Sequence, residues 1–402
     1  MKKRILILEQ QSWSGGAQRV LEVVLSSLTD EFDPIVAFPD DGSFSMALHE
    51  QGIATCTFPL GTYRPGKKSY PEMFLFVLRS LHCALKLAAL IRKERIAVIY
   101  INGPRCLMAG VLAAWLTRSP SLFHLHLILA RKSEIFVVKC LARRVATILA
   151  CSEAAAESLL KADRRLASKT KVLYNPVPPR VDIGCVAITD LPDTTADQIT
   201  IGMVGRITES KNYEVALNAI SKLRKELQAK IRLIVVGAPA PGCAEDLRYA
   251  QSLQESAMRY GLRGKILWAG YQPDPGPYYS LMDVLLHPSL SEALGLTILE
   301  ALDRRIPVIA FRTGGIPEIV IHEFNGLLAS PEDEDDLCRN LESFADDRAV
   351  RERLVGGARA GLDSRFSLET FRSTVRNLIH ELCSAGISSK TGAQHGEPAI
   401  WK

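Results

Sequence analysis

The sequence contains no C-x-x-C pair, and its nine cysteines show no spacing that is typical of metal ligands. We therefore expect reduced cysteines in a cytoplasmic protein. The first apolar run, Ile5–Leu8, is shorter than the roughly seven residues of a signal peptide, so no such peptide is expected. The dinucleotide fingerprint G-x-G-x-x-G is missing from the first glycine-rich turn, which removes the main support for a nicotinamide-dependent enzyme.

The chain has 402 residues, of which 47% are apolar and 23% are charged. This composition excludes wholesale disorder, a collagen-like repeat and a multi-span membrane protein. A single hydrophobic core usually stops growing at roughly 250–300 residues. The length therefore predicts two domains.

Short apolar runs alternate with helical periodicity along both halves of the chain. This alternation predicts an α/β protein with a doubly wound, Rossmann-like parallel sheet in each half. The first half has expected strands at Arg4–Leu8, Pro34–Phe38, Ala54–Phe58, Ala97–Ile101, Ser121–His126, Ala146–Cys151 and Lys171–Tyr174, and the second at Thr200–Val204, Ile231–Gly237, Lys265–Gly270, Asp283–His287 and Pro307–Phe311.

A stretch rich in Pro, Asp and Thr separates the two halves. We expect an N-terminal domain at 1–176, a linker at 177–198 and a C-terminal domain at 199–364. A helix at 365–384 follows, and residues 385–402 show no pattern and are expected to be disordered.

Basic residues are concentrated in one part of the chain. Residues 60–150 hold fifteen Lys and Arg against three Glu, a balance of +12, whereas the whole chain carries only +5. This segment is expected to meet an anionic partner, and a phospholipid surface or a phosphate-bearing acceptor fits as well as nucleic acid does. Basic residues on solvated helix faces would give the same charge balance without an anionic partner. Nucleic acid is disfavoured because no recognised binding motif accompanies the charge.

Within this segment, residues 72–91 are mostly apolar but include Arg79, His82 and Lys86. Such a stretch is too polar for a clear membrane span, and it is suited to lying in a membrane interface. A buried amphipathic helix would have the same pattern, so both interpretations stay open.

In each half, one motif follows the first strand, at the carboxyl end where parallel sheets bind ligands. Gly15 and Gly16 would let the backbone approach a ligand closely, and the helix after them would direct N–H groups at an anion. In the second half, Arg206 and Lys211 could converge on a diphosphate. Gly15 and Gly16 could instead form a plain tight turn, and Arg206 and Lys211 could instead be two exposed basic residues before a helix.

The third motif is the most specific. Glu292 lies in a loop after a predicted strand, and Gly295 leads into a helix that contains Glu300. Eight helical residues span roughly 12 Å, whereas a carboxylate pair that acts on one bond needs about 5 to 9.5 Å. The two glutamates are therefore expected to hold opposite ends of an extended ligand, with phosphates at the helix N-terminus between them. Glu300 could instead form a structural ion pair.

These motifs together resemble a GT-B-fold, retaining glycosyltransferase of family four, also described as glycosyl transferases group 1. The resemblance extends to about Cys383. It rests on Gly15–Arg19 as G-G-[AT]-[EQ]-[RK], on Gly205, Arg206 and Lys211 as G-R…K, on Glu292 and Glu300 as E-x7-E, and on Pro307–Glu318 as the segment downstream.

The resemblance implies an N-terminal acceptor-binding domain and a C-terminal nucleotide-sugar domain that face a central cleft, with the last helix packed back on the N-terminal domain. It implies that Arg206 and Lys211 hold the donor diphosphate, aided by the amides of Gly295 and Leu296. Glu292 would meet the sugar hydroxyls and Glu300 the ribose. A histidine near the reacting sugar would be His126, or else His124, since strand alternation puts both on one face.

One departure concerns the E-x7-E motif, where Ala293 and Leu294 replace the usual Gly and aromatic residue. We expect donor binding to survive, whereas the sugar preference is open. No metal or other cofactor is expected, because protein cations can balance the diphosphate. The D-x-D string at Asp333–Asp335 is interpreted as the acidic first turn of a helix.

The predicted function is transfer of a sugar, with retention, from a nucleotide-diphosphate donor to a glycan or lipid-linked acceptor in cell-surface polysaccharide or lipopolysaccharide biosynthesis. The expected location is the cytoplasm, with peripheral attachment at the inner face of the plasma membrane through residues 60–150. The alternatives are a GT-B-fold nucleotide-sugar epimerase and a noncatalytic membrane-docking protein.

Overall fold

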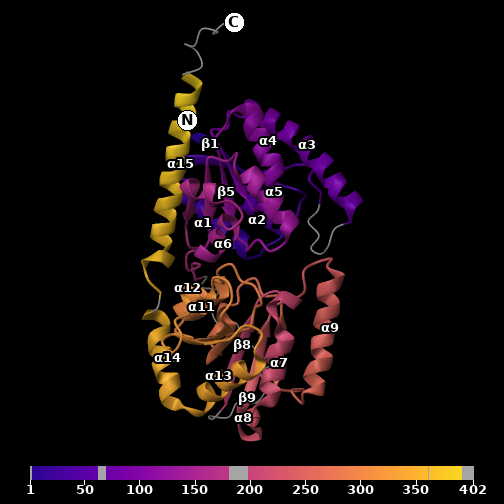
Figure 1. The fold of residues 1–402 in the computed structure, drawn as a ribbon, viewed down its shortest axis with the longest axis vertical. Helices are drawn as coiled ribbons and strands as arrows, with labels where there is room; N and C mark the ends of the chain where they lie inside the picture. The colour runs from indigo at the N-terminus through magenta and orange to yellow at the C-terminus, as the bar shows by residue number, and fades with distance from the viewer. Residues whose placement is uncertain (1, 62–68, 181–197, 361, 392–402) are drawn as a thin grey trace. The chain divides into compact units, whose positions relative to one another are not determined.

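The structure is a computed structural model that describes residues 2–61, 69–180, 198–360 and 362–391. The chain divides into two compact units, one formed by Met1–Asn175 with Leu368–Lys402 and the other by Pro176–Ser367. Each unit contains one sheet covered by helices (Figure 1). Most of the predicted linker, 181–197, lies outside the described residues, and so does the end of the predicted tail, 392–402.

The first unit holds a seven-stranded sheet in the order β3-β2-β1-β4-β5-β6-β7, and all of its neighbouring strands are parallel. The strand order reverses between β1 and β4, which is where doubly wound sheets bind ligands. Its strands are β1 (Lys3–Glu9), β2 (Phe32–Phe38), β3 (Ala54–Thr57), β4 (Val98–Asn102), β5 (Ser121–Leu125), β6 (Thr147–Ala150) and β7 (Thr170–Val172).

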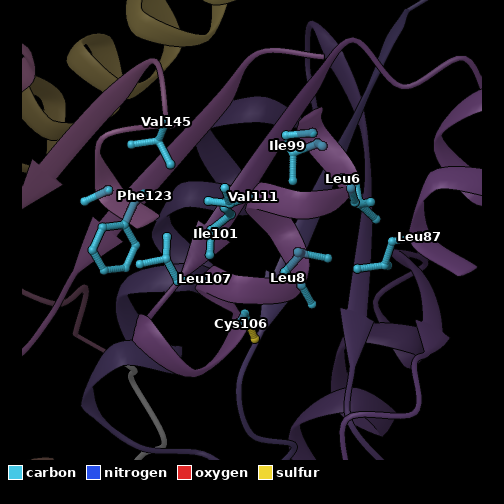
Figure 2. Packing of buried hydrophobic residues seen from close by; sticks show 14 of the residues in the cluster. Leu6, Leu8, Leu87, Ile99, Ile101, Cys106, Leu107, Val111, Phe123 and Val145 are labelled. Carbon is cyan, nitrogen blue, oxygen red and sulfur yellow. The ribbon is translucent and has the colours of Figure 1, made fainter. Parts of the chain in front are cut away.

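Helices connect these strands and cover the sheet. They are α1 (Gly16–Leu28), α2 (Ser43–Glu50), α3 (Tyr70–Lys93), α4 (Leu107–Thr117), α5 (Lys132–Ala142) and α6 (Glu153–Leu160), with short 3-10 turns η1 (Pro104–Cys106) and η2 (Arg164–Lys169). Because side chains alternate along a strand, one set from β1, β4 and β5 faces α4. Figure 2 shows this packing of Leu6, Leu8, Ile99, Ile101 and Phe123 with Leu107 and Val111.

The second unit holds a six-stranded parallel sheet in the order β10-β9-β8-β11-β12-β13, with the order reversing between β8 and β11. Its strands are β8 (Ile199–Val204), β9 (Ile231–Val236), β10 (Ile266–Gly270), β11 (Val284–His287), β12 (Val308–Phe311) and β13 (Gly326–Ala329). Its helices are η3 (Glu209–Lys211), α7 (Tyr213–Lys222), α8 (Lys225–Lys230), α9 (Ala244–Arg259), α10 (Gly276–Tyr279), α11 (Leu296–Asp303), α12 (Ile316–Ile319), α13 (Glu334–Asp346), α14 (Arg348–Ala360) and η4 (Ser364–Phe366).

The prediction of two doubly wound parallel sheets is confirmed. The sequence analysis missed β13, whose four residues begin with glycine and include no β-branched or aromatic side chain. Asp333 caps α13 by accepting a hydrogen bond from the Asp336 N–H at 2.9 Å, as expected for the acidic first turn of a helix.

The last helix, α15 (Leu368–Thr391), belongs to the first unit and lies beside α1 (Figure 1). Phe371, Val375 and Ile379 are buried on its inner side. The helix continues to Thr391, beyond the predicted helix end at residue 384.

Candidate functional site

The main candidate site lies at the carboxyl end of the second sheet. Strand β11 ends at His287, and the loop after it carries Glu292 before α11 begins. The Leu290 N–H donates to the Ser210 carbonyl at 3.0 Å, which joins this loop to the turn after β8. Residues that are far apart in the sequence are thereby brought to one edge of the sheet.

Lys211 and Glu292 form an ion pair between Nζ and Oε2, and both side chains are largely buried. The His287 Nε2 lies 3.1 Å from the same carboxylate oxygen. Burial alone would raise the pKa of Glu292, but the charge of Lys211 and the hydrogen bond from His287 outweigh it and hold this pKa well below its usual range. Burial and Lys211 lower the pKa of His287, so the ring is neutral and donates its Nε2 proton. The site therefore holds an ionised carboxylate and a fixed cation.

Gly295 occupies the N-cap of α11 with φ of 106°, a conformation that favours glycine. A Cβ at this position would lie 2.9 Å from Ile298 Cδ1. The helix begins at Leu296, and amides of a first turn have no partner within their own helix. Leu296 is thus placed to present a backbone N–H at this edge of the sheet.

Glu300 lies inside α11 and is 2% exposed. Its Oε2 accepts a hydrogen bond from the Tyr279 hydroxyl at 2.9 Å, and the Arg304 guanidinium lies 5.0 Å from the centre of that ring. Glu300 therefore contacts a tyrosine side chain from α10. The sequence analysis missed Tyr279, because this residue lies on α10, 21 residues before Glu300, and belongs to none of the motifs.

Arg206 follows β8 and differs from Lys211 in its surroundings. Its side chain is 41% exposed, and its Nε lies 3.8 Å from Asp246 Oδ2. The structure brings Lys211 and Glu292 into contact, whereas Arg206 stays with Asp246, at the start of α9. A pairing at this distance and exposure is weak.

The second Gly-Gly pair, Gly314 and Gly315, holds the Glu292 loop in place. The Gly315 N–H donates to the Glu292 carbonyl at 2.9 Å, and a Cβ on Gly315 would lie 2.1 Å from the Ala293 carbonyl oxygen. The Thr313 hydroxyl donates to the Ser289 carbonyl at 2.7 Å. This role was missed, although the glycine pair after a strand was visible in the sequence.

In the first unit, His124 and His126 lie at the end of β5 with their rings in contact, the centroids being 3.8 Å apart. His124 is fully buried and pairs with the Tyr100 hydroxyl, whereas His126 is partly exposed. Burial lowers the pKa of His126 to about 4. Of the two histidines, His126 is therefore the better placed to meet a ligand.

Two polar residues that the sequence analysis missed lie beside His126. Asn102, at the end of β4, accepts from His126 Nε2 at 2.8 Å, and its own amide donates to Glu9, at the end of β1. Each residue ends its strand directly after four apolar residues, and this was the signal that could have revealed them.

Gly15 and Gly16 begin α1 next to this group. Gly15 is extended, with φ of −158°, and a Cβ on it would lie 3.0 Å from Gln18 Oε1. The close approach therefore concerns the Gln18 side chain, which donates to Glu9 at 2.8 Å.

Each unit matches a family model. Residues 14–181 match "Glycosyltransferase Family 4", and residues 192–360 match "Glycosyl transferases group 1". The two sheets, in this order, define the GT-B class of glycosyltransferase folds. The chain belongs to glycosyltransferase family four.

Curated relatives cover part of the chain. The D-inositol 3-phosphate glycosyltransferase of Stackebrandtia nassauensis is 33% identical over 42% of this chain and 38% of its own length. The lipopolysaccharide core biosynthesis mannosyltransferase LpcC of Rhizobium leguminosarum bv. viciae is 26% identical over 68% of this chain and 75% of its own length. The matched segments span about half the length, or less, of several other relatives.

Among solved structures, HepE of Anabaena in complex with UDP-glucose has a TM-score of 0.76 and 24% sequence identity. The match covers 95% of this chain and 99% of that one. At this identity the likeness establishes the fold alone.

Proposed function

We propose that this protein transfers a sugar from a nucleotide-diphosphate donor to a glycan or lipid-linked acceptor in the synthesis of a cell-surface polysaccharide or lipopolysaccharide. The observation that carries the proposal is the largely buried Lys211–Glu292 pair beside the first turn of α11. LpcC, a lipopolysaccharide core mannosyltransferase, and HepE, which was solved with UDP-glucose, support the choice of acceptor and donor.

In this proposal each residue has a distinct task. An ammonium group has three N–H donors, so Lys211 can donate to Glu292 and to a phosphate oxygen at the same time. Arg206, half exposed, is free to turn from Asp246 to the same diphosphate. Glu292 accepts from the sugar hydroxyls, Glu300 accepts from the ribose, and the backbone amides of Gly295 and Leu296 donate to phosphate oxygens.

The proposed chemistry is stabilisation of the leaving group. Breaking the sugar–phosphate bond builds negative charge on the departing diphosphate, and cations that are already fixed lower that barrier selectively. We propose that Lys211 and Arg206 supply this charge without a divalent metal. Retention, by front-face attack that the donor phosphate assists, is carried over from the family resemblance, and NMR of the anomeric proton in the product tests it.

A thermal-shift screen of the full chain against UDP-, GDP-, ADP- and dTDP-sugars tests donor binding. A true donor stabilises the folded state by mass action, by about 2.7 kcal/mol at a concentration of a hundred times Kd. We expect one nucleotide class to raise Tm and Lys211→Ala to lose that rise. A rise that survives in Lys211→Ala contradicts the diphosphate assignment.

Donor alone, without acceptor, separates transfer from epimerisation. A GT-B-fold epimerase would convert the sugar in this incubation, and a transferase would leave its configuration unchanged.

We further propose that the protein works at the cytoplasmic face of the plasma membrane and binds it through α3. This helix is long and apolar enough to cross a membrane by length and composition, although its sequence was expected to be too polar for a clear span. In its most apolar window 33% of the residues are buried. One side, with Cys83, Leu87 and Ile91, packs into the first unit. The opposite side exposes four large apolar residues at helical spacing, Phe74, Leu78, Leu81 and Leu85.

A helix that is packed on one side and apolar on the other is suited to lying in the membrane interface, with its outer face inserted about 5–10 Å. Arg79 and Lys86 are exposed on the same helix, and residues 60–150 carry the surplus of +12. Anionic lipids attract such residues by about 1 kcal/mol for each basic side chain near the surface. The partner that fits is therefore an anionic bilayer.

Flotation with vesicles of phosphatidylcholine, with and without phosphatidylglycerol, tests this surface. We expect binding to the anionic vesicles and its loss in Leu78→Ser/Leu81→Ser. Met258→Ser, which removes an exposed apolar residue of α9 in the second unit, is the matched control and should bind like the native chain. Equal flotation of all three proteins contradicts the proposal.

A further inference from the structure

Glu9 is a fully buried carboxylate at the end of β1 that the proposed chemistry does not use. Its Oε1 accepts from Gln18 Nε2 at 2.8 Å and from the backbone N–H groups of Gln10 and Gln11 at 2.7 and 3.2 Å. Its Oε2 accepts from Asn102 Nδ2. All four of these groups are N–H donors, so the site is built for an acceptor on both oxygens.

Glu9 determines which way the Asn102 amide faces. The two residues are partners in the parallel register of β1 and β4, and Asn102 is in turn the partner of His124 on β5. Because Nδ2 donates to Glu9, the Oδ1 end faces His126 and accepts from its Nε2 at 2.8 Å. An amide oxygen can only accept, so the proton of the His126 ring must be on Nε2.

The other ring nitrogen of His126, Nδ1, is enclosed and has no hydrogen-bond partner among the described residues. An unpaired acceptor in such a place is unfavourable, because it has lost its contact with water and has gained no other hydrogen bond. A hydroxyl donor would satisfy it, and the sugar hydroxyls of the proposed reaction have this chemistry.

We propose that Glu9 is a positioning residue that acts through Asn102 to keep the proton of His126 on Nε2 and the lone pair on Nδ1, ready to accept from a sugar hydroxyl. The sugar contact rests on the proposed function, whereas the relay from Glu9 to His126 does not. The ring is neutral at pH 7 because burial lowers the pKa of His126 to about 4.

Replacing Glu9 by Gln reverses the relay. The Gln oxygen takes the place of Oε1, which accepts from three N–H groups, so the Gln NH₂ takes the place of Oε2. An NH₂ group cannot accept from Asn102, so the Asn102 amide must turn its Oδ1 to Gln and its Nδ2 to His126. His126 must then accept at Nε2 and carry its proton on Nδ1. NMR of the full chain with ¹⁵N-labelled histidine, at pH 8 and without ligand, reads the tautomer directly, and His126→Gln assigns the signal.

We expect Nε2–H in the native protein and Nδ1–H in Glu9→Gln. In Glu9→Gln/Asn102→Asp both oxygens at position 102 are acceptors, so this variant should restore Nε2–H without Glu9. Turnover with the sugar found in the thermal screen should fall roughly tenfold in Glu9→Gln, as the loss of one neutral hydrogen bond implies. It should recover in the double variant.

An unchanged Nε2–H signal in Glu9→Gln overturns the relay. A changed tautomer with unchanged turnover overturns its role in transfer. If the native chain shows no transfer, the proposed function fails while the tautomer result still stands. Should Glu9→Gln not fold, Asn102→Ala breaks the same relay, and a fixed Nε2–H in that variant also contradicts the proposal.

Discussion

Glu292 keeps its charge inside the protein because Lys211 and His287 contact the same carboxylate oxygen. An ion pair of this kind is costly to break from one side, since the remaining charge stays buried without its partner. A substitution at Lys211 should therefore affect both the proposed chemistry and stability, whereas one at an exposed lysine should affect neither.

Lys211→Ala is expected to reduce turnover at least about a hundredfold, which corresponds to roughly 2.7 kcal/mol of transition-state stabilisation. Arg206→Ala should lower the rate by a similar factor and leave stability nearly unchanged, since its pairing with Asp246 is weak. Initial rates and urea unfolding measure both effects. Lys222→Ala, which removes exposed ion pairs with Glu334 and Asp335 in the same unit, is the control. Near-normal turnover in Lys211→Ala or Arg206→Ala would contradict the diphosphate assignment.

His126 should make the free energy of unfolding fall as the pH falls. Its pKa falls from the ordinary 6.5 to about 4 on folding, so the unfolded chain binds the proton more tightly. The contribution to stability is present above pH 6.5 and is lost as the pH falls to 4, by up to about 3 kcal/mol. Urea unfolding at pH 7 and pH 4.5 should show a smaller loss in His126→Gln than in the native chain. Equal losses would mean that the ring is protonated in the folded state.

Glu9 acts in the opposite direction. Burial raises its pKa from 4.5 to about 7, against the hydrogen bonds that lower it. Its contribution to stability is present below pH 4.5 and is lost as the pH rises through 7. Glu9→Gln should therefore lose less stability than the native chain between pH 5 and pH 8, as urea unfolding at the two values can measure. A steeper loss in the variant would show that Glu9 is ionised at low pH.

At the scale of elements, the neighbouring strands β8 and β9 of the second sheet approach each other closely after they end. Gly237 follows β9 with φ of 154°, and a Cβ on it would lie 1.8 Å from the Gly205 carbonyl oxygen after β8. Gly205 is also held by the Tyr213 hydroxyl, which donates to its carbonyl at 2.8 Å. This contact sets the start of the turn that carries Arg206 and Lys211.

Gly237→Ala is expected to destabilise the protein by roughly 2–4 kcal/mol, because it combines backbone strain with a backbone clash. Gly261→Ala is the matched control, since Gly261 has φ of 70° and nothing lies within 4 Å of its added Cβ. The control should cost only about 1 kcal/mol from its backbone conformation. Chemical unfolding of both variants separates the clash from the strain, and equal costs would contradict the close approach.

At the scale of the whole molecule, the chain returns to the first unit in its last helix. His380 Nε2 lies 2.6 Å from Glu31 Oε2 and its ring centre lies 4.8 Å from that of Phe32, while Ile379 is fully buried. Ile379→Ala should cost about 2–5 kcal/mol through lost burial and a cavity. Glu381→Ala, on the exposed side of the helix, should cost little. Calorimetry of the full chain compares the two, and an unchanged Tm in Ile379→Ala would mean that α15 does not pack on this unit.

The sequence by itself determined the two sheets and most of their strands, because burial in a parallel sheet requires continuous apolar runs and amphipathic helices leave a periodic signal. It also located Lys211, Glu292 and Glu300, since each follows a strand or lies in a motif of fixed spacing. Only the tertiary structure decided which side chains meet. Lys211 pairs with Glu292 across 81 residues, and Asn102 reaches Glu9 across 93. Contacts over such separations depend on how strands are ordered in the sheet, and no local pattern of residues contains that order.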